Sequence, residues 1–149
     1  MRAVDRVVID TNVLLALGIF TDPVVAPLRT ALARGALQAV RSAATDAEWR
    51  EVLARPGLFA VPPERQAALI ADWEATALLV PVTATVHLRC RDPLDQKFLE
   101  LAVAAQARWL VTRDKALLKL RRKARTLGLD IVTPELFAAG WLPPVAASP

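Results

Sequence analysis

The segment that decides the fold is Arg6–Leu15, which reads RVVIDTNVLL. After the arginine its first residues are apolar and β-branched, a pattern typical of a strand that is buried on both faces. Asp10, Thr11 and Asn12 follow, and one of their side-chain oxygens is expected to cap the helix that the next apolar residues begin. A buried strand that passes through polar residues into a helix is the usual first unit of a parallel α/β sheet.

The same alternation of short apolar strands and amphipathic helices continues along the chain. Further strands are predicted at Leu37–Arg41, Leu78–Val82, Trp109–Val111 and Asp130–Val132. Further helices are predicted over Val24–Arg34, Thr45–Ala54, Pro63–Ala77, Leu94–Ala107, Lys115–Ala124 and Pro134–Gly140. We therefore expect a single three-layer α/β/α domain of Rossmann-like type, with a central parallel sheet, over residues 1–141. Residues 142–149 are expected to form a flexible tail.

The composition favours a small cytoplasmic protein. The chain has 149 residues, and 54% of them are hydrophobic, which is enough for a buried core. Its longest apolar runs, such as Val13–Leu17 and Ala77–Val82, fall short of the roughly 18 residues that cross a bilayer. The amino terminus shows no secretory cleavage site, and the single Cys90 cannot form an internal disulfide. We expect no contact with a membrane.

The residues that are scarce narrow the chemistry. With one histidine, one cysteine and no tyrosine, the chain cannot build a zinc site from several Cys and His ligands, and it has little capacity for acid–base catalysis by imidazole. Its five glycines are scattered, so the sequence contains no Gly-rich phosphate loop, which argues against a nucleotide-binding α/β protein. Any catalysis is expected to come from carboxylates, through a bound metal ion.

Acidic side chains recur at corresponding places in the predicted units. Asp10 and Asp114 each follow a strand and precede a helix. Glu48, Asp92 and Asp95 lie at the starts of two further helices. Ligands of open parallel sheets bind beyond the carboxyl ends of the strands, and parallel strands share that edge. We therefore expect these acids to lie at one edge of the sheet.

Every one of these acids has a plainer alternative as a helix cap. Thr45 and Glu48 match a capping box, and Asp92 stands before a proline that opens a helix. Asp10 and Asp114 suit the caps of the helices that follow them. A cap needs one acceptor per helix, however, and five acids at one edge would raise one another's pKa values. Mg²⁺ or Mn²⁺, which prefers oxygen ligands, would relieve that repulsion.

The distribution of charge fits an acidic pocket within basic surroundings. The chain has 19 Lys and Arg against 15 Asp and Glu, so the five acids above leave 10 elsewhere. Between Arg108 and Arg125 there are eight cations and one acid. Such a run suits a phosphate backbone, although a solvated helix face is the plainer alternative. An acidic pocket in a basic protein is the layout expected of a nuclease.

Four motifs in order resemble the PIN-domain family, and most closely its branch of VapC-like ribonucleases, the toxins of toxin–antitoxin systems. They are VVIDTNVLL, EWREVLARP, DPLDQKFLELA and ARWLVTRDKALL, and the likeness extends over about residues 5–137. The departures are Leu94 and Gln96, which stand where this branch often has two further acids. Since Asp95 is retained, we expect the core of the site to persist.

The resemblance implies the role of individual residues. It implies that the catalytic and metal-binding acids are Asp10, Glu48, Asp95 and Asp114, with Glu51 as a substitute for Glu48. It implies that the residues supporting the site are Thr11, Asn12, Asp92 and Thr112. The cations expected to bind the RNA backbone are Arg113, Lys115 and Lys119.

The function implied is that of an endoribonuclease dependent on Mg²⁺ or Mn²⁺ that hydrolyses RNA phosphodiester bonds. The resemblance also implies a cognate antitoxin protein as partner, and a homodimer is typical of the family. One alternative stays open at this point: a catalytically silent PIN-fold module that binds RNA or a protein. The two missing acids favour this alternative slightly, whereas the intact Asp10, Asp95 and Asp114 favour the enzyme.

Overall fold

The protein is built on one five-stranded sheet, in which every neighbouring pair of strands is parallel. The computed structural model describes residues 4–20, 22–57, 60–83 and 86–141. The strand order is β3-β2-β1-β4-β5. The strands are β1 Asp5–Ile9, β2 Leu37–Arg41, β3 Leu78–Leu79, β4 Trp109–Val111 and β5 Asp130–Val132. The predicted parallel α/β sheet is therefore confirmed.

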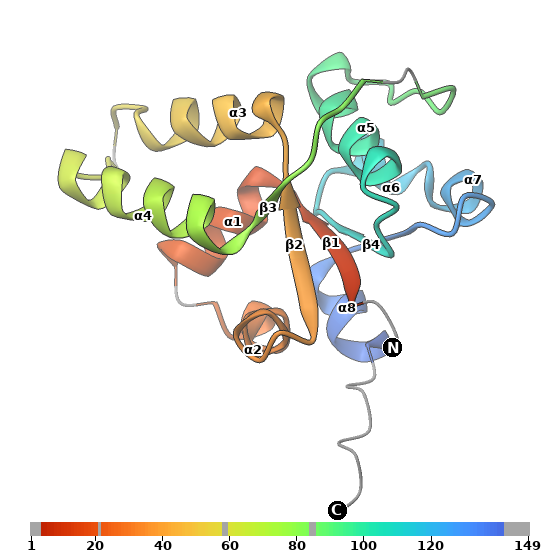
Figure 1. Ribbon diagram of the computed structural model, residues 1–149, viewed down its shortest axis with the longest axis horizontal. Helices are drawn as coiled ribbons and strands as arrows, with labels where there is room; N and C mark the ends of the chain where they lie inside the picture. Colours follow the sequence, from red (N-terminus) through yellow and green to blue (C-terminus); the bar gives the residue numbers. More distant parts are fainter. Residues whose placement is uncertain (1–3, 21, 58–59, 84–85, 142–149) are drawn as a thin grey trace, which may run out of the picture.

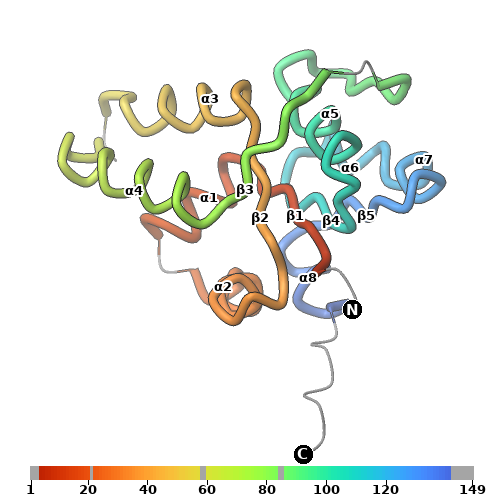
Figure 2. Tube along the Cα trace, viewed as in Figure 1, coloured from red at the N-terminus to blue at the C-terminus, as the bar shows by residue number. Residues whose placement is uncertain are grey.

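Helices cover both faces of the sheet and make the predicted three layers (Figure 1). One layer contains α1 Thr11–Gly18, the 3-10 turn η1 Pro23–Val25, α2 Ala26–Ala33, α3 Ala43–Leu53, α4 Pro63–Thr76 and α8 Pro134–Gly140. The other contains the 3-10 turn η2 Pro93–Asp95, α5 Gln96–Ala104, α6 Lys115–Leu118 and α7 Arg121–Arg125. Figure 2 shows the same separation along the Cα trace.

Side-chain alternation along the central strands divides the hydrophobic core into two clusters. In β1, Val7 and Ile9 join the cluster beneath α1, α2, α3 and α8, whereas Val8 joins the cluster beneath α5. In β4, Leu110 lies on the α5 side and is fully buried. Successive side chains of a strand point to opposite faces, so a strand with helices on both sides is apolar throughout. This is the physical basis of the continuous apolar pattern in β1.

The start of α3 differs from the expectation and changes the reading of Glu48. The predicted helix began with Thr45 as its cap, but α3 begins at Ala43 and its cap is Ser42. Thr45 lies inside the first turn, where its hydroxyl accepts the Ser42 amide proton at 2.9 Å, and its own amide donates to the Ser42 hydroxyl at 3.2 Å. The capping box therefore joins Ser42 to Thr45. Glu48 lies in the next turn and takes no part in it.

Two other predicted elements are shorter than expected. The predicted strand Leu78–Val82 pairs only over Leu78–Leu79, with one further bond from the Val80 amide to the Arg41 carbonyl. Pro81 then ends it, because proline has no amide proton to donate. The predicted helix Lys115–Ala124 is interrupted between α6 and α7. Its cations recur at spacings of three and four residues, where like charges destabilise a continuous helix.

In the described parts of the chain, no single helix is long and apolar enough to cross a bilayer. Among these residues, one pair of helical segments, α1 and Pro23–Ala33, reaches a sufficient length and apolar composition when taken together, but the pair is bent by 103°. The tail predicted over residues 142–149 lies outside the described residues.

Candidate active site

Asp10 is buried at the carboxyl end of β1, with 5% of its surface exposed. Its amide donates to the Val111 carbonyl at 3.0 Å and so continues the pairing of β1 with β4. Its Oδ2 accepts a hydrogen bond of 2.6 Å from the Thr112 hydroxyl. Asp10 occupies the cap position of α1, where its side chain makes no capping hydrogen bond of normal distance and angle, although the nearby Asn12 amide still lowers its pKa. Its close partner is the Thr112 hydroxyl, so capping is not the main role of this residue.

Burial raises the pKa of Asp10, and the charges of Glu48 and Asp114 raise it further. The hydrogen bond from Thr112 and the backbone amide of Asn12 oppose that increase. The influence of Glu48 and Asp114 shows that acids from three separate segments lie close enough to interact. The Asn12 side chain itself is exposed.

The Thr112 hydroxyl connects two of the acids. It is fully buried, donates to Asp10 and accepts the Asp114 amide proton at 3.0 Å. Asp114 does cap α6, because its Oδ1 accepts from the Ala116 amide at 2.8 Å. Capping and membership of the acidic cluster are thus compatible for Asp114, since the cap bonds use only one of its two carboxylate oxygens.

Asp95 completes the central group of acids. It is the last residue of η2 and makes no capping bond, and its Oδ2 is buried without a hydrogen-bond partner in the part of the chain that the structure describes. Burial is the main cause that raises the pKa of Asp95 to about 7, followed by a hydrogen bond with Asp114 and the charges of Asp114, Asp92 and Asp10. Asp10, Asp95 and Asp114 therefore form one electrostatically coupled cluster.

Glu48 lies beside this cluster and is held by two other groups. The Thr11 hydroxyl donates to its Oε2, and the Lys97 ammonium donates to its Oε1 at 2.7 Å. Glu51, the substitute considered from the sequence, points elsewhere: it is 70% exposed and pairs with Arg55 at 3.4 Å. Of the two glutamates, only Glu48 contacts the site.

Asp92 stands at the rim of the site. Its side chain caps η2 by accepting the Leu94 amide proton at 3.0 Å, as the capping alternative predicts. Its charge still reaches Asp95 and raises the pKa of that residue. Asp92 thus belongs to the surroundings of the cluster and is exposed.

The predicted RNA-binding cations differ in their surroundings. Arg113 pairs with Asp22 at 3.5 Å and with Glu135 at 3.0 Å, which directs its guanidinium toward η1 and α8. Lys115 and Lys119 are exposed on and after α6, beside the Asp114 end of the cluster. The two lysines are therefore better placed to meet a phosphate backbone than Arg113 is.

Two residues of the DPLDQKF motif have roles that the sequence analysis missed. Gln96 is buried and joins α5 to the preceding loop, because its amide group donates to the Leu88 carbonyl at 2.9 Å and its Oε1 accepts the Cys90 amide proton at 2.6 Å. An aspartate cannot donate in this way, which explains glutamine at this position. Lys97 is the residue that pairs with Glu48. The sequence offered one indication of this role, since Lys97 is the single cation within the acidic DPLDQKF motif.

The acids are not arranged as a closed metal cage. Among the described residues, no group of three or more His, Cys, Asp and Glu side chains is positioned to hold a metal ion. The hydrogen bond between Asp95 and Asp114 and the ion pair of Glu48 with Lys97 occupy part of the donor set. A cation bound there would have to compete with the proton that the raised pKa of Asp95 favours.

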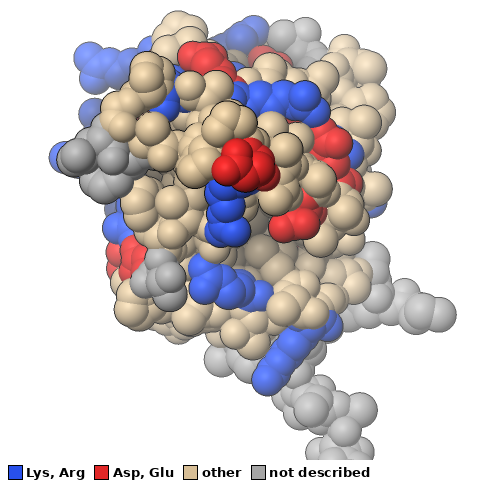
Figure 3. Space-filling model, turned by 90° about the vertical axis from the view of Figure 1, so that its left-hand side faces the viewer, with Lys and Arg blue, Asp and Glu red and all other residues tan. Residues whose placement is uncertain are grey.

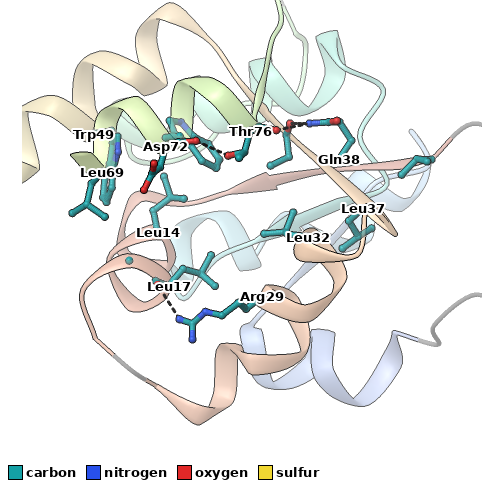
Figure 4. A pocket seen from close by; sticks show the side chains of 15 residues that line it. Leu14, Leu17, Arg29, Leu32, Leu37, Gln38, Trp49, Leu69, Asp72 and Thr76 are labelled. Atoms are coloured by element: carbon teal, nitrogen blue, oxygen red, sulfur yellow. Dashed lines mark hydrogen bonds between the residues drawn. The ribbon is translucent and has the colours of Figure 1, made fainter. Parts of the chain in front are cut away.

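A cavity lies away from the acids. Its volume is about 500 Å³, it opens to the surface, and its lining comes from α1, α2, α3, α4 and β2; Figure 4 shows its leucine and tryptophan side chains. Its charged residues are Asp72 and Arg29, and the latter donates to the Leu17 carbonyl at 2.6 Å. Figure 3 shows the corresponding side of the molecule, where acidic and basic groups alternate around a hollow. The cavity is mainly apolar and contains none of the clustered acids.

Replacing the hydroxyl that joins β1 and β4 tests the described geometry. Thr112→Val should lower the free energy of unfolding by about 1–3 kcal/mol, because it leaves the buried Asp10 carboxylate and the Asp114 amide without their partner. Chemical denaturation measures this change. Thr112→Ser keeps the hydroxyl and is the matched control, so equal losses in the two variants would contradict the role of the hydrogen bonds.

The raised pKa of Asp95 predicts a dependence of stability on pH. Because the pKa in the folded protein lies above that of the unfolded chain, the native state binds more protons between the ordinary value of 3.8 and about 7. Without divalent cations, the free energy of unfolding should therefore fall by about 1–2 kcal/mol as pH rises from about 5 to 8, a value reduced for solvent screening.

Denaturation in EDTA at a series of pH values measures this effect, and Asp95→Asn is the variant for comparison. Asparagine does not titrate, so the variant should lose most of the pH dependence over this window. If the variant and the wild type show the same slope, Asp95 is not the titrating group.

Comparison with known proteins adds a family to this geometry. Curated proteins include no sequence that matches the chain. Among solved structures, the chain is similar to one from the crystal structure of VapBC2 from Rickettsia felis bound to a DNA fragment from their promoter, with a TM-score of 0.57 and 12% identity over 86% of this chain and 98% of that chain. At this identity the likeness concerns the fold. The family model described as PIN domain matches residues 6–116 of this chain. Because these residues make up well over half of the chain, the chain belongs to the PIN-domain family.

Proposed function

We propose that this protein is a ribonuclease that depends on Mg²⁺ or Mn²⁺ and hydrolyses RNA phosphodiester bonds. The observation that carries the proposal is the cluster of Asp10, Asp95 and Asp114, which the buried Thr112 hydroxyl helps to join. Burial first, and then the neighbouring carboxylates, raise the pKa values of Asp10 and Asp95. Membership of the PIN-domain family supports the same activity. A fold alone does not define a function, whereas the clustered acids supply a specific chemistry.

The chemistry of the donor set suits a hard divalent cation, although the described side chains would have to move to surround one. Carboxylate oxygens are the ligands that Mg²⁺ and Mn²⁺ prefer, and the buried Oδ2 of Asp95 has no hydrogen-bond partner in the described part of the chain. Asp10, Asp95 and Asp114 would hold the ion, with Glu48 beside them. When bound, such an ion makes a coordinated water more acidic and stabilises charge on the phosphoryl oxygens.

Other residues of the chain orient the ligands and meet the substrate. Thr112 holds Asp10 and the backbone of Asp114 in place through one buried hydroxyl. Lys115 and Lys119 lie exposed next to the cluster, and α7 adds further exposed cations. Contacts of this kind to phosphates give an affinity that is largely independent of sequence and falls with rising salt.

Hydrolysis of single-stranded RNA in the presence of Mn²⁺ tests the proposal. EDTA should abolish cleavage, and Asp10→Asn should reduce it by at least about 100-fold, the upper end of the effect seen when a group that only supports a metal ligand is lost. Asp5→Asn is the matched control, because Asp5 is exposed at the opposite end of the same strand. Cleavage that withstands both EDTA and Asp10→Asn would falsify the mechanism, whereas RNA binding without cleavage would favour the silent module.

We further propose that the protein is the toxin of a toxin–antitoxin pair and that its antitoxin buries apolar side chains in the cavity between α1, α2 and α4. Support comes from the apolar lining of that cavity, from the buried Trp49 Nε1, which has no partner in the described residues, and from the likeness to a chain of a VapBC2 structure. The cavity is separate from the acids, so binding there and cleavage are separable by mutation.

Expression in a bacterial host tests this role. The wild-type chain should arrest growth, Asp10→Asn should not, and the protein encoded beside it should relieve the arrest. Leu69→Arg, which places a charge in the cavity, should still arrest growth but should escape that relief. Normal growth with the active wild-type ribonuclease would contradict the toxin role while leaving the nuclease intact.

A further inference from the structure

The acidic residues fall into two sets that are held by different groups. Asp10, Asp95 and Asp114 are coupled to one another, through the Thr112 hydroxyl and the hydrogen bond of Asp95 with Asp114. The charges that act on Asp95 come from Asp114, Asp92 and Asp10, and Glu48 is not among them. Glu48 thus belongs to the edge of the cluster nearest Asp10, whose pKa it does raise.

Both oxygens of Glu48 are already engaged. Oε1 lies 2.7 Å from the Lys97 ammonium, and Oε2 accepts from the Thr11 hydroxyl. The side chains of Glu48 and Lys97 are each only 21% exposed, and Thr11 is buried. Breaking an ion pair in such a partly buried setting is unfavourable, because removing one partner leaves the other charge desolvated and unpaired.

The backbone fixes the position of Lys97. Lys97 lies in the first turn of α5, two residues after Asp95, and its neighbours Phe98 and Leu99 are buried in the core beneath that helix. Its Nζ also lies 5.7 Å from the centroid of the Phe98 ring. The backbone of α5 together with the ion pair to Glu48 therefore places the ammonium at the edge of the acidic cluster.

We propose that the Lys97 ammonium occupies the place of a second divalent cation, so that the acidic site takes one divalent ion. This inference rests on the proposed metal-dependent function and specifies it. Lys97 is a positioning residue in this scheme: it neutralises Glu48, holds it beside Asp10 and leaves three aspartates for the single ion. Removing the ammonium would free both the charge and an oxygen of Glu48 for another cation.

The number of Mn²⁺ ions bound per chain tests the inference without any assay of activity. Isothermal titration calorimetry gives the stoichiometry, and electron paramagnetic resonance detects the magnetic coupling of two neighbouring Mn²⁺ ions. We expect one ion in the wild type and two coupled ions in Lys97→Met. Lys115→Met is the matched control, because Lys115 is an exposed lysine beside Asp114, and it should still bind one ion.

A double variant identifies the ligand of the added ion. Lys97→Met combined with Glu48→Gln should return the stoichiometry to one, because the second ion depends on the freed glutamate. Thermal unfolding of each variant shows that it is folded. If Lys97→Met does not fold, two coupled ions in the wild type would still overturn the inference, and Glu48→Gln in the wild-type background should leave the stoichiometry at one.

Each result separates this inference from the wider proposal. Two coupled ions in the wild type, or a single ion in folded Lys97→Met, would overturn the role of Lys97 and leave the metal-dependent nuclease standing. If the wild type binds no Mn²⁺ at millimolar concentration, the proposed function itself fails, and the inference fails with it.

Discussion

The site depends on the parallel pairing of β1 with β4. That pairing places Ile9 opposite Val111, so the polar residues that follow each strand emerge together at one edge of the sheet. The buried Thr112 hydroxyl then bonds to Asp10, a residue 102 positions away in the sequence. Because each strand packs against helices on both faces, a slip of one residue would exchange the side chains that fit the two helix layers and would disturb both clusters of the core. The register of the sheet therefore sets the position of the acids.

Bringing these acids together opposes folding, and the divalent cation of the proposed function would relieve that opposition. Burial and mutual repulsion raise the pKa values of Asp10 and Asp95, which means that ionising them lowers the stability of the native state. The structure offsets part of this effect with the Thr112 hydroxyl and with the Lys97 ammonium on Glu48. Clustered groups with raised pKa values are typical of functional sites, where a bound ligand compensates for their repulsion.

Helix capping and the candidate chemistry use the same residue types, and only the contacts distinguish them. Asp92 and Asp114 do cap the elements that follow them, whereas Asp10 and Asp95 stand at cap positions without capping bonds. Glu48 has no capping role because the cap of α3 is Ser42, three residues before the predicted cap Thr45. A residue that occupies a cap position without using it is thus a useful indication that its side chain serves another purpose.

The sequence by itself determined the order of strands and helices along the chain, because this order follows from local hydrophobic periodicity. It also determined the parallel class of the sheet and the edge at which Asp10 and Asp114 lie, because parallel strands share one direction. Only the tertiary structure decided that Glu48 binds Lys97 and Thr11, and that Arg113 turns toward Asp22 and Glu135. Those partners come from distant segments of the chain. Which of several nearby charges pair depends on side-chain reach after packing, and no pattern of spacing within one segment contains that information.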